Sequence, residues 1–510
     1  MSLQQRVRNI GLVAGPVLAL VVYLALPAGY LDPAGKVVAI GHATRATLAM
    51  LVWMATWWMT EAVEIEVTSL LPIVAFPLLG VMPLVKTAAN YAADVIFLFF
   101  GGFVLALAIQ RWGLDRRIAF QTLKWVGTRP AAIVAGIMGA TAFVSMWVSN
   151  TATAAMMVPI ALSIVDLSLR RRTGRSLVEH GGIPQDDVDD RNLALSLLLG
   201  VAYASSIGGL GTIIGSPPNG IFVRFYEQTY GVQISFVRWM VVGIPVMLLF
   251  LPLAWFLNTR VLFPTRIGEL EGGKAWVAEE IARLGPLSRA ERATMLVFAV
   301  TVFCWIFRPL LADVRVAGFA PLANLSDAVI AVAAALALFL VPIDRARGIF
   351  LSDWDTAVKL PWGVLILFGG GLALAAATEA NGVAQFIGSL ARDFAGWPVM
   401  AVVFTIIALM VFMSELTSNT AQVATMLPIL AALAPVLGVP PALLLLLPAT
   451  IAASCAFMMP VGTPPNAIVF GTGLVRMPQM IKAGFWLNVS GIFLITALTY
   501  LLIGPVLGAR

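Results

Sequence analysis

Two stretches, VSNTATAAMMVP at 148–159 and TSNTAQVATMLP at 417–428, decide the fold of this chain. Both place a Ser-Asn-Thr triplet eight residues before a proline, inside segments that are otherwise apolar. Polar residues in an apolar setting are costly unless the fold supplies hydrogen-bond partners or ligands for them. Their recurrence therefore indicates a paired site.

The composition is that of a membrane protein. Of 510 residues, 60% are hydrophobic and only 11% are charged, against about a quarter in ordinary soluble proteins. The mean hydropathy is +0.94, and many windows hold the roughly 18 or more apolar residues that a bilayer-spanning helix needs. These features predict an all-α polytopic membrane protein with about 11 transmembrane helices.

The cysteines, histidines and net charge argue against several other classes. Cys304 and Cys455 lie in apolar runs and are interpreted as buried side chains, not as a disulfide or metal site. The two histidines lie far apart in polar connections, so neither a metal centre nor a His-based triad is expected. The net charge of +6 comes without a basic cluster interleaved with aromatic residues, so we expect no binding to nucleic acid.

The sequence contains an internal repeat. A shift of 269 positions superimposes Phe99 on Phe368 and the first Ser-Asn-Thr triplet on the second. Downstream the shift becomes 247, which superimposes GSPPN at 215–219 on GTPPN at 462–466. The difference of 22 residues fits one extra polar loop in the first half, at 170–191. Repeats of this kind are common in secondary transporters, whose sites lie where the halves meet.

The distribution of charge predicts that the repeat is inverted. With the N-terminus in the cytoplasm and each triplet at the tip of a re-entrant hairpin, most of the 32 Lys and Arg fall in cytoplasmic connections, as the positive-inside rule expects. The first hairpin, 131–170, then opens inward and the second, 397–436, opens outward. The segment 268–292 is interpreted as an amphipathic helix on the cytoplasmic face.

The chemistry of these segments suits an ion and an anion together. The arms of the hairpins are too short to span a membrane, so their tips stop near its middle, where the backbone groups at helix ends need partners from protein, water or ligand. Ser, Asn and Thr can cap helix N-termini and offer uncharged oxygens to Na⁺. The Pro-Pro-Asn sequences predict a second break in each half, with free carbonyls and a helix N-terminus. Two such half-sites would suit a substrate with two carboxylates.

Glu415, beside the second triplet, has no counterpart in the first half, where Met146 occupies the equivalent position. An intramembrane carboxylate is often functional, so Glu415 is either a proton carrier or a structural hydrogen-bond acceptor. The sequence leaves both interpretations open.

Four segments carry a family resemblance: SMWVSNTATAAMMVPI, SIGGLGTIIGSPPN, SELTSNTAQVATMLPI and SCAFMMPVGTPPNAIVFG. They resemble the divalent anion/sodium symporter family, whose members carry C4-dicarboxylates, citrate or sulfate, and the resemblance runs from about residue 45 to the C-terminus. It implies a homodimer in which a transport domain moves against a fixed scaffold by an elevator motion.

The resemblance also implies site residues. A first sodium site maps to Ser145, Ser149, Asn150 and the Gly215 carbonyl, and a second to Ser414, Thr417, Asn419 and the Gly462 carbonyl. The substrate carboxylates map to Asn150, Thr151, Asn419 and Thr420, with Ser216, Pro217, Thr463 and Pro464 close by. Ser414 and Gly462 are small departures from the family pattern at the second cation site.

These inferences divide the chain into scaffold and transport segments. Scaffold helices are expected at 1–130 and, with the cytoplasmic amphipathic segment, at 236–396, and a last transmembrane helix at 481–510. Transport elements are expected at 131–235, with hairpin 131–170 and broken helix 192–230, and at 397–480, with hairpin 397–436 and broken helix 442–475.

The expected function is sodium-coupled symport of C4-dicarboxylates such as succinate, malate and fumarate. The protein would lie in a bacterial-type inner membrane among lipid, with its N-terminus cytoplasmic and its C-terminus periplasmic or extracellular. Alternatives are a dicarboxylate exchanger, a citrate or sulfate carrier, and a channel. A membrane-embedded hydrolase using Ser149 or Ser418 is disfavoured because no His or Asp/Lys pairing stands near either serine, so no enzyme activity is expected.

Overall fold

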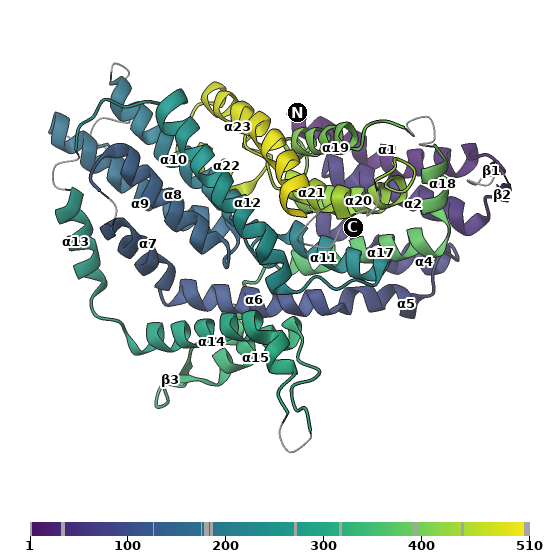
Figure 1. Ribbon diagram of the computed structural model, residues 1–510, viewed down its shortest axis with the longest axis horizontal. Helices are drawn as coiled ribbons and strands as arrows, with labels where there is room; N and C mark the ends of the chain where they lie inside the picture. The colour runs from purple at the N-terminus through teal and green to yellow at the C-terminus, as the bar shows by residue number, and fades with distance from the viewer. Residues whose placement is uncertain are drawn as a thin grey trace.

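The computed structural model describes residues 3–31, 36–125, 127–174, 176–177, 183, 187–269, 273–315, 319–390, 396–439 and 443–503. These residues are helical almost throughout, and the helices form one elongated body (Figure 1). Residues 175, 178–182 and 184–186 of the extra polar loop predicted at 170–191, and the C-terminal residue Arg510, lie outside the described residues.

The elements follow one another as a long series of helices with two short antiparallel strand pairs. The first half comprises α1 (Leu3–Ala25), β1 (Gly29–Leu31), β2 (Val37–Ala39), α2 (His42–Thr60), α3 (Ile65–Thr68), α4 (Leu71–Leu78), α5 (Leu84–Ala89), η1 (Asn90–Ala92), α6 (Asp94–Arg111), α7 (Leu114–Trp125), α8 (Pro130–Ser145), α9 (Asn150–Thr173), α10 (Val188–Gly208), α11 (Pro217–Tyr230) and α12 (Phe236–Phe256). Then come η2 (Leu257–Leu262), α13 (Gly273–Leu284), α14 (Arg289–Ala312), α15 (Asp327–Leu340), β3 (Pro342–Asp344), β4 (Ile349–Phe350), α16 (Trp354–Ala357), α17 (Trp362–Ala380), α18 (Val383–Leu390), α19 (Val399–Ser414), α20 (Asn419–Leu433), α21 (Leu443–Ala453), α22 (Pro464–Phe470), α23 (Met477–Leu498) and η4 (Thr499–Ile503).

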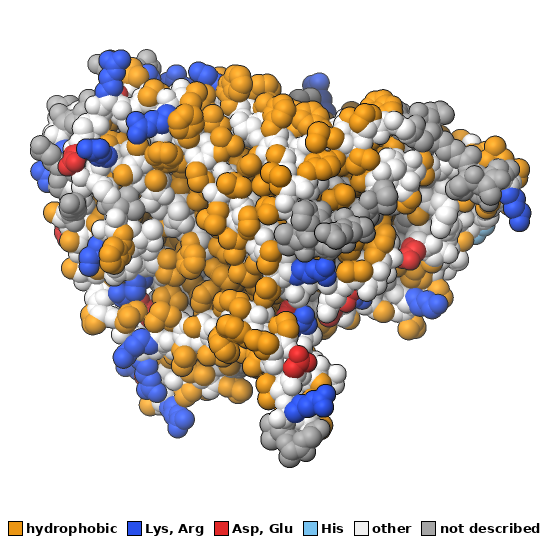
Figure 2. All heavy atoms as spheres, viewed as in Figure 1, with side chains coloured by type: hydrophobic (Ala, Val, Ile, Leu, Met, Phe, Trp, Pro, Cys, Tyr) orange, Lys and Arg blue, Asp and Glu red, His pale blue; other side chains and the backbone are white. Residues whose placement is uncertain are grey.

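The helices are those of a multi-pass membrane protein. Within the described residues, seven helices are long and apolar enough to cross a membrane, and six further apolar helices are shorter. The shorter group includes α8, α19 and α20, which are arms of the two predicted hairpins. Hydrophobic side chains cover a broad central area of the visible face, while Lys and Arg gather toward its edges (Figure 2). The total number of crossings stays a prediction.

Equivalent residues of the two halves meet inside the protein. Phe99 of α6 and Phe368 of α17, which the 269-residue shift relates, lie edge to face with ring centroids 4.8 Å apart. Both side chains are fully buried. The two positions matched by the repeat are thus in direct contact, while the inversion of the repeat stays a prediction.

Each half also places a glycine at the same helix end. Gly113 follows α6 with a φ of +68°, and its equivalent, Gly382, follows α17 with a φ of +69°. The short helices α7 and α18 begin directly after these turns. A Cβ at Gly113 would meet no atom within 4 Å, so the glycine is needed for its left-handed backbone and not for space.

We therefore expect Gly113→Ala to lower the free energy of unfolding by about 1–2 kcal/mol, the usual cost of a left-handed residue with a Cβ. Thermal unfolding of the purified protein measures the change. Gly139, inside α8, also has open space around it, but its helical backbone suits alanine. Gly139→Ala should raise stability by about 0.5–1 kcal/mol. Equal effects of the two substitutions would contradict the interpretation.

Candidate functional site

Both Ser-Asn-Thr triplets lie where a helix begins. In the first half α8 ends at Ser145 and α9 begins at Asn150, where the Ser149 hydroxyl accepts a hydrogen bond from the Ala152 N–H at 3.4 Å. In the second half α19 ends at Ser414 and α20 begins at Asn419. There the Ser418 hydroxyl accepts from the Ala421 N–H at 3.5 Å. Serine caps the first turn in both places, as its side chain favours.

The Pro-Pro-Asn sequences start the helices that follow the second break. The chain leaves helix α10 after Gly208 and re-enters a helix at Pro217, while the equivalent gap separates Ala453 from Pro464. Proline suits the first helical position, where its missing N–H would have no partner. The irregular segment after α10 is buried, and the one after α21 is buried except at 458–461, where it is partly or fully exposed. Buried backbone polar groups in such segments must be satisfied by side chains or ligands.

One asparagine in each half closes this irregular segment. The Asn219 amide nitrogen donates to the carbonyls of Gly209 (2.9 Å) and Thr212 (2.8 Å). Asn466 donates in the same way to the carbonyls of Ala456 (3.1 Å) and Met459 (3.0 Å). The 247-residue shift relates the two donors and both pairs of acceptors, so the two halves use the same hydrogen bonds. The three pairs are Asn219 and Asn466, Gly209 and Ala456, and Thr212 and Met459. No role for these two asparagines was expected from the sequence, although their recurrence after Pro-Pro was the available signal.

Oxygen atoms converge at the first tip. One terminal atom of the Asn150 amide lies 2.7 Å from Ser145 Oγ, 3.0 Å from the Ser205 carbonyl and 3.2 Å from the Gly215 carbonyl. As an amide nitrogen, this atom donates to all three oxygens. With the amide turned over, its oxygen would complete a group of four oxygens, the ligand type that hard cations prefer.

Glycine makes this convergence possible. A Cβ on Gly209 would lie 2.5 Å from the Asn150 amide and 2.9 Å from the Gly215 carbonyl. Any larger residue would therefore displace the group. Of the predicted first-site residues, the structure brings Ser145, Asn150 and Gly215 together, while the Ser149 hydroxyl serves the helix cap.

The second tip is built differently. Ser414 Oγ donates to the amide oxygen of Gln422 at 2.9 Å and lies near the Ala453 carbonyl, whereas the Thr417 hydroxyl donates to Met413 O at 2.9 Å. The amide oxygen of Asn419 is buried and has no hydrogen-bond partner among the described residues. A buried oxygen without a hydrogen-bond donor lowers the stability of the fold. It is a candidate ligand for a cation or for a water molecule bound with the substrate.

Gly462 completes the second tip. A Cβ there would lie 3.2 Å from the Ser414 carbonyl and 3.3 Å from the Glu415 Cα, so the Gly462 backbone packs directly against the end of α19. The structure thus brings Gly462 and Ser414 together. It does not join Asn419 to Ser414 by a hydrogen bond, because Gln422 takes that place.

Glu415 acts as a hydrogen-bond acceptor for the irregular segment after α21. Its carboxylate accepts from three consecutive backbone N–H groups, at Phe457, Met458 and Met459, over 2.8–3.0 Å. The Asn488 amide donates a further bond at 2.6 Å. In the first half the equivalent segment is held instead by Thr212, whose hydroxyl bonds the Met146 carbonyl and accepts from the Gly215 N–H. The structure therefore shows the acceptor role that the sequence left open.

The candidate site draws on both halves of the chain. Helix α22 packs against α9, and α11 packs against α20, so each Pro-Pro-Asn helix lies on the Ser-Asn-Thr helix of the other half (Figure 1). Ser216 and Thr463 are buried at the N-caps of α11 and α22. Thr151 and Pro464 are exposed, while Pro217 and Thr420 are half-buried.

Comparisons with known proteins agree with this architecture. The model of the sodium:sulfate symporter transmembrane region matches residues 13–509. The chain is 39% identical over 500 residues to the sodium-dependent dicarboxylate transporter SdcS of Staphylococcus saprophyticus, covering 98% of this chain and 92% of that protein. It is likewise 39% identical over 502 residues to SdcS of Staphylococcus aureus, with the same coverage.

Two solved transporter structures share the fold. The YdaH transporter of Alcanivorax borkumensis matches with a TM-score of 0.56 at 12% identity, covering 98% of each chain. MtrF of Neisseria gonorrhoeae matches with a TM-score of 0.53 at 10% identity, covering 99% of this chain and 95% of that one. At these identities the likeness concerns the fold alone.

Proposed function

The chain belongs to the sodium:sulfate symporter family, whose members are transporters and not enzymes, and from this premise we propose that it couples the inward movement of a C4-dicarboxylate to Na⁺. The observation that carries the proposal is the group of oxygens around Asn150. The names of the SdcS relatives support both the ion and the substrate class. Succinate, malate and fumarate are the proposed substrates.

The coupling follows from charge compensation. A dianion is costly to move into a low-dielectric interior, and bound cations lower that cost. Na⁺ at the first tip would be held by Ser145, Asn150 and the Gly215 carbonyl, the groups that converge there. The coupling free energy between two bound ligands is the same in both directions. Substrate would therefore raise the affinity for Na⁺ by the same factor as Na⁺ raises the affinity for substrate.

The two carboxylates of the substrate would be shared between the halves. Asn150 and Thr151 would receive one, and Asn419 and Thr420 the other, with Ser216 and Thr463 at the neighbouring helix starts. The cross-packing of α9 with α22 and of α11 with α20 supports this division, because it brings elements of the two half-sites together. Ser414, Thr417, Asn419 and Gly462 would form the second sodium site.

Movement would follow an elevator scheme. The segments 131–235 and 397–480 would travel together, while 1–130, 236–396 and 481–510 would form the scaffold. The equivalent glycine turns at Gly113 and Gly382 support this division, since each lies beside a short helix that connects scaffold to transport segment. A homodimer in a bacterial inner membrane, with a cytoplasmic N-terminus and an external C-terminus, completes the proposal.

Uptake into proteoliposomes tests the function. We expect accumulation of labelled succinate when Na⁺ is higher outside than inside, and little accumulation when K⁺ replaces Na⁺. Unlabelled malate and fumarate should compete, and citrate and sulfate should compete less. Uptake that requires internal succinate but no Na⁺ gradient would identify an exchanger. Equal uptake in Na⁺ and K⁺ without internal substrate would refute sodium coupling.

A further inference from the structure

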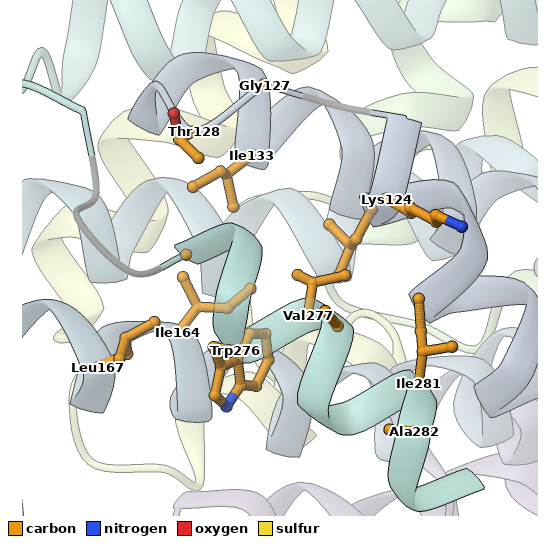
Figure 3. A pocket seen from close by; sticks show the side chains of 13 residues that line it. Lys124, Gly127, Thr128, Ile133, Ile164, Leu167, Trp276, Val277, Ile281 and Ala282 are labelled. Carbon is orange, nitrogen blue, oxygen red and sulfur yellow. The ribbon is translucent and has the colours of Figure 1, made fainter. Parts of the chain in front are cut away.

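A cavity of about 450 Å³ lies away from the candidate transport site, between α7, α13 and the hairpin α8–α9 (Figure 3). Its walls are formed by Leu123, Lys124, Gly127, Thr128, Ile133, Ile164, Leu167, Gly273, Trp276, Val277, Ala278, Ile281 and Ala282. In the close-up, aliphatic and indole side chains from all sides surround the space. The volume is within the range of small-molecule sites, about 300–1,000 Å³.

The side of the cavity formed by α7 and α13 is held as one unit. The rings of Trp276 and Phe120 lie 5.8 Å apart, and Arg117 donates to the carbonyls of Leu284 and Gly285 at the end of α13. Arg117 also pairs with Glu291 of α14 at 2.6 Å. Helix α13 is therefore fixed to α7 and α14, and the cavity separates it from the hairpin.

The crevice continues past Trp276. A second cavity of about 240 Å³ has Trp276 and Glu280 of α13 on one side and Met156, Pro159 and Ile160 of α9 on the other. Trp276 thus lies between the two cavities, which both lie between α13 and α9. Hairpin helix α9 and amphipathic helix α13 do not pack closely along this line.

The lining fits a hydrocarbon chain. Among its side chains only Lys124, Thr128 and the indole of Trp276 carry a nitrogen or oxygen atom, so water would find few partners there. In a membrane protein the abundant apolar ligand is a lipid acyl chain. An acyl chain filling the cavity would bury walls that are almost entirely apolar.

The rim carries positive charge. Lys124 is exposed and makes no hydrogen bond or ion pair within the part of the chain that the structure describes. Its ammonium lies at the edge of the group of side chains in the close-up (Figure 3). Arg171 is exposed and follows the lining residue Leu167 by four positions, which places it on the same face of α9 one turn further on.

We propose that this crevice binds one acyl chain of an anionic phospholipid, with the headgroup between Lys124 and Arg171. The chain lies along Trp276, between the α7–α13 unit and hairpin helix α9. Its presence sets the spacing between α13 and the hairpin, so the lipid influences any motion of the hairpin against α7. This site does not depend on which substrate the protein carries.

Fluorescence quenching by brominated lipid tests the proposal. The protein has 14 tryptophans, so the signal of Trp276 is taken as the difference between the unchanged protein and Trp276→Phe. In phosphatidylcholine vesicles, brominated phosphatidylglycerol should quench this difference signal at a lower mole fraction than brominated phosphatidylcholine. Each rim cation should contribute roughly fivefold to that preference, since a basic residue near an anionic surface contributes about that factor.

Variants separate the crevice from the general lipid surface. Ala282→Phe fills the cavity and should remove the quenching, whereas Ala275→Phe, exposed on the same helix but outside the lining, should leave it unchanged. Lys124→Gln and Arg171→Gln should each reduce the preference for phosphatidylglycerol roughly fivefold, and Arg289→Gln should not.

Native mass spectrometry of the detergent-solubilised protein gives a second measurement that does not use Trp276. We expect one phosphatidylglycerol retained per chain in the unchanged protein and none in Ala282→Phe. Equal quenching by the two lipids, or retention that Ala282→Phe does not change, would overturn the proposal.

Discussion

Asn150→Ala is expected to abolish sodium-driven uptake and to weaken Na⁺ binding by roughly 10- to 150-fold, the range for a lost contact to a charged group. The Asn150 amide is the point on which Ser145 Oγ and the carbonyls of Ser205 and Gly215 converge. Alanine removes the central ligand and leaves a gap among three oxygens. Substrate affinity should fall with Na⁺ affinity, because the two are linked.

Isothermal titration in detergent measures both affinities. Asn90→Ala is a matched control, since the Asn90 amide donates to the carbonyls of Lys86 and Thr87 and the residue lies in η1, outside both hairpins. Should Asn150→Ala spare both affinities, the first sodium site and the substrate assignment would both be wrong. Loss of substrate binding alone would keep Asn150 as a substrate ligand and move the cation elsewhere.

Glu415→Ala is the second substitution with a large expected effect, and the effect is on folding. It removes the acceptor of three backbone N–H groups and of the Asn488 amide in a buried place. An unsatisfied buried donor costs about 1–3 kcal/mol, so we expect a loss of several kcal/mol and a lower yield of folded protein. Thermal unfolding in detergent measures it.

Glu415→Gln separates the structural role from proton transfer. Its amide oxygen can still accept, but its NH₂ group would face other donors, so stability should lie between those of the unchanged protein and Glu415→Ala. Glu379→Ala, at an exposed position, is the control and should have little effect. A fully stable Glu415→Gln protein whose uptake has lost its dependence on pH would instead show a proton carrier.

The sequence predicted the helix ends around the site well, because helix ends depend on residues that are close together in the chain. Capping by the Ser-Asn-Thr triplets and helix breaks at the Pro-Pro-Asn sequences depend on neighbouring residues, and the recurrence at fixed shifts placed both copies. Asn150, Ser145 and the Gly215 carbonyl were placed together only through the family resemblance, and the structure brings them within hydrogen-bonding distance.

The contacts that the sequence did not predict join different helices. Glu415 meets Asn488, Ser414 meets Gln422 where Asn419 was expected, and Trp276 faces α9 across a cavity. None of these pairings has a local signal, since each depends on how helices from different segments pack. The asparagines of the Pro-Pro-Asn sequences are an intermediate case: their motif was visible, but the carbonyls that they bind were not.

The packing of each Pro-Pro-Asn helix on the opposite half has a consequence for how such a chain can be divided. If residues 1–235 were produced alone, the faces of α9 and α11 that α22 and α20 normally cover would be bare. A lone half would hold no complete pocket and would have to recruit a complementary fragment to work. Co-expressed fragments should therefore regain uptake together.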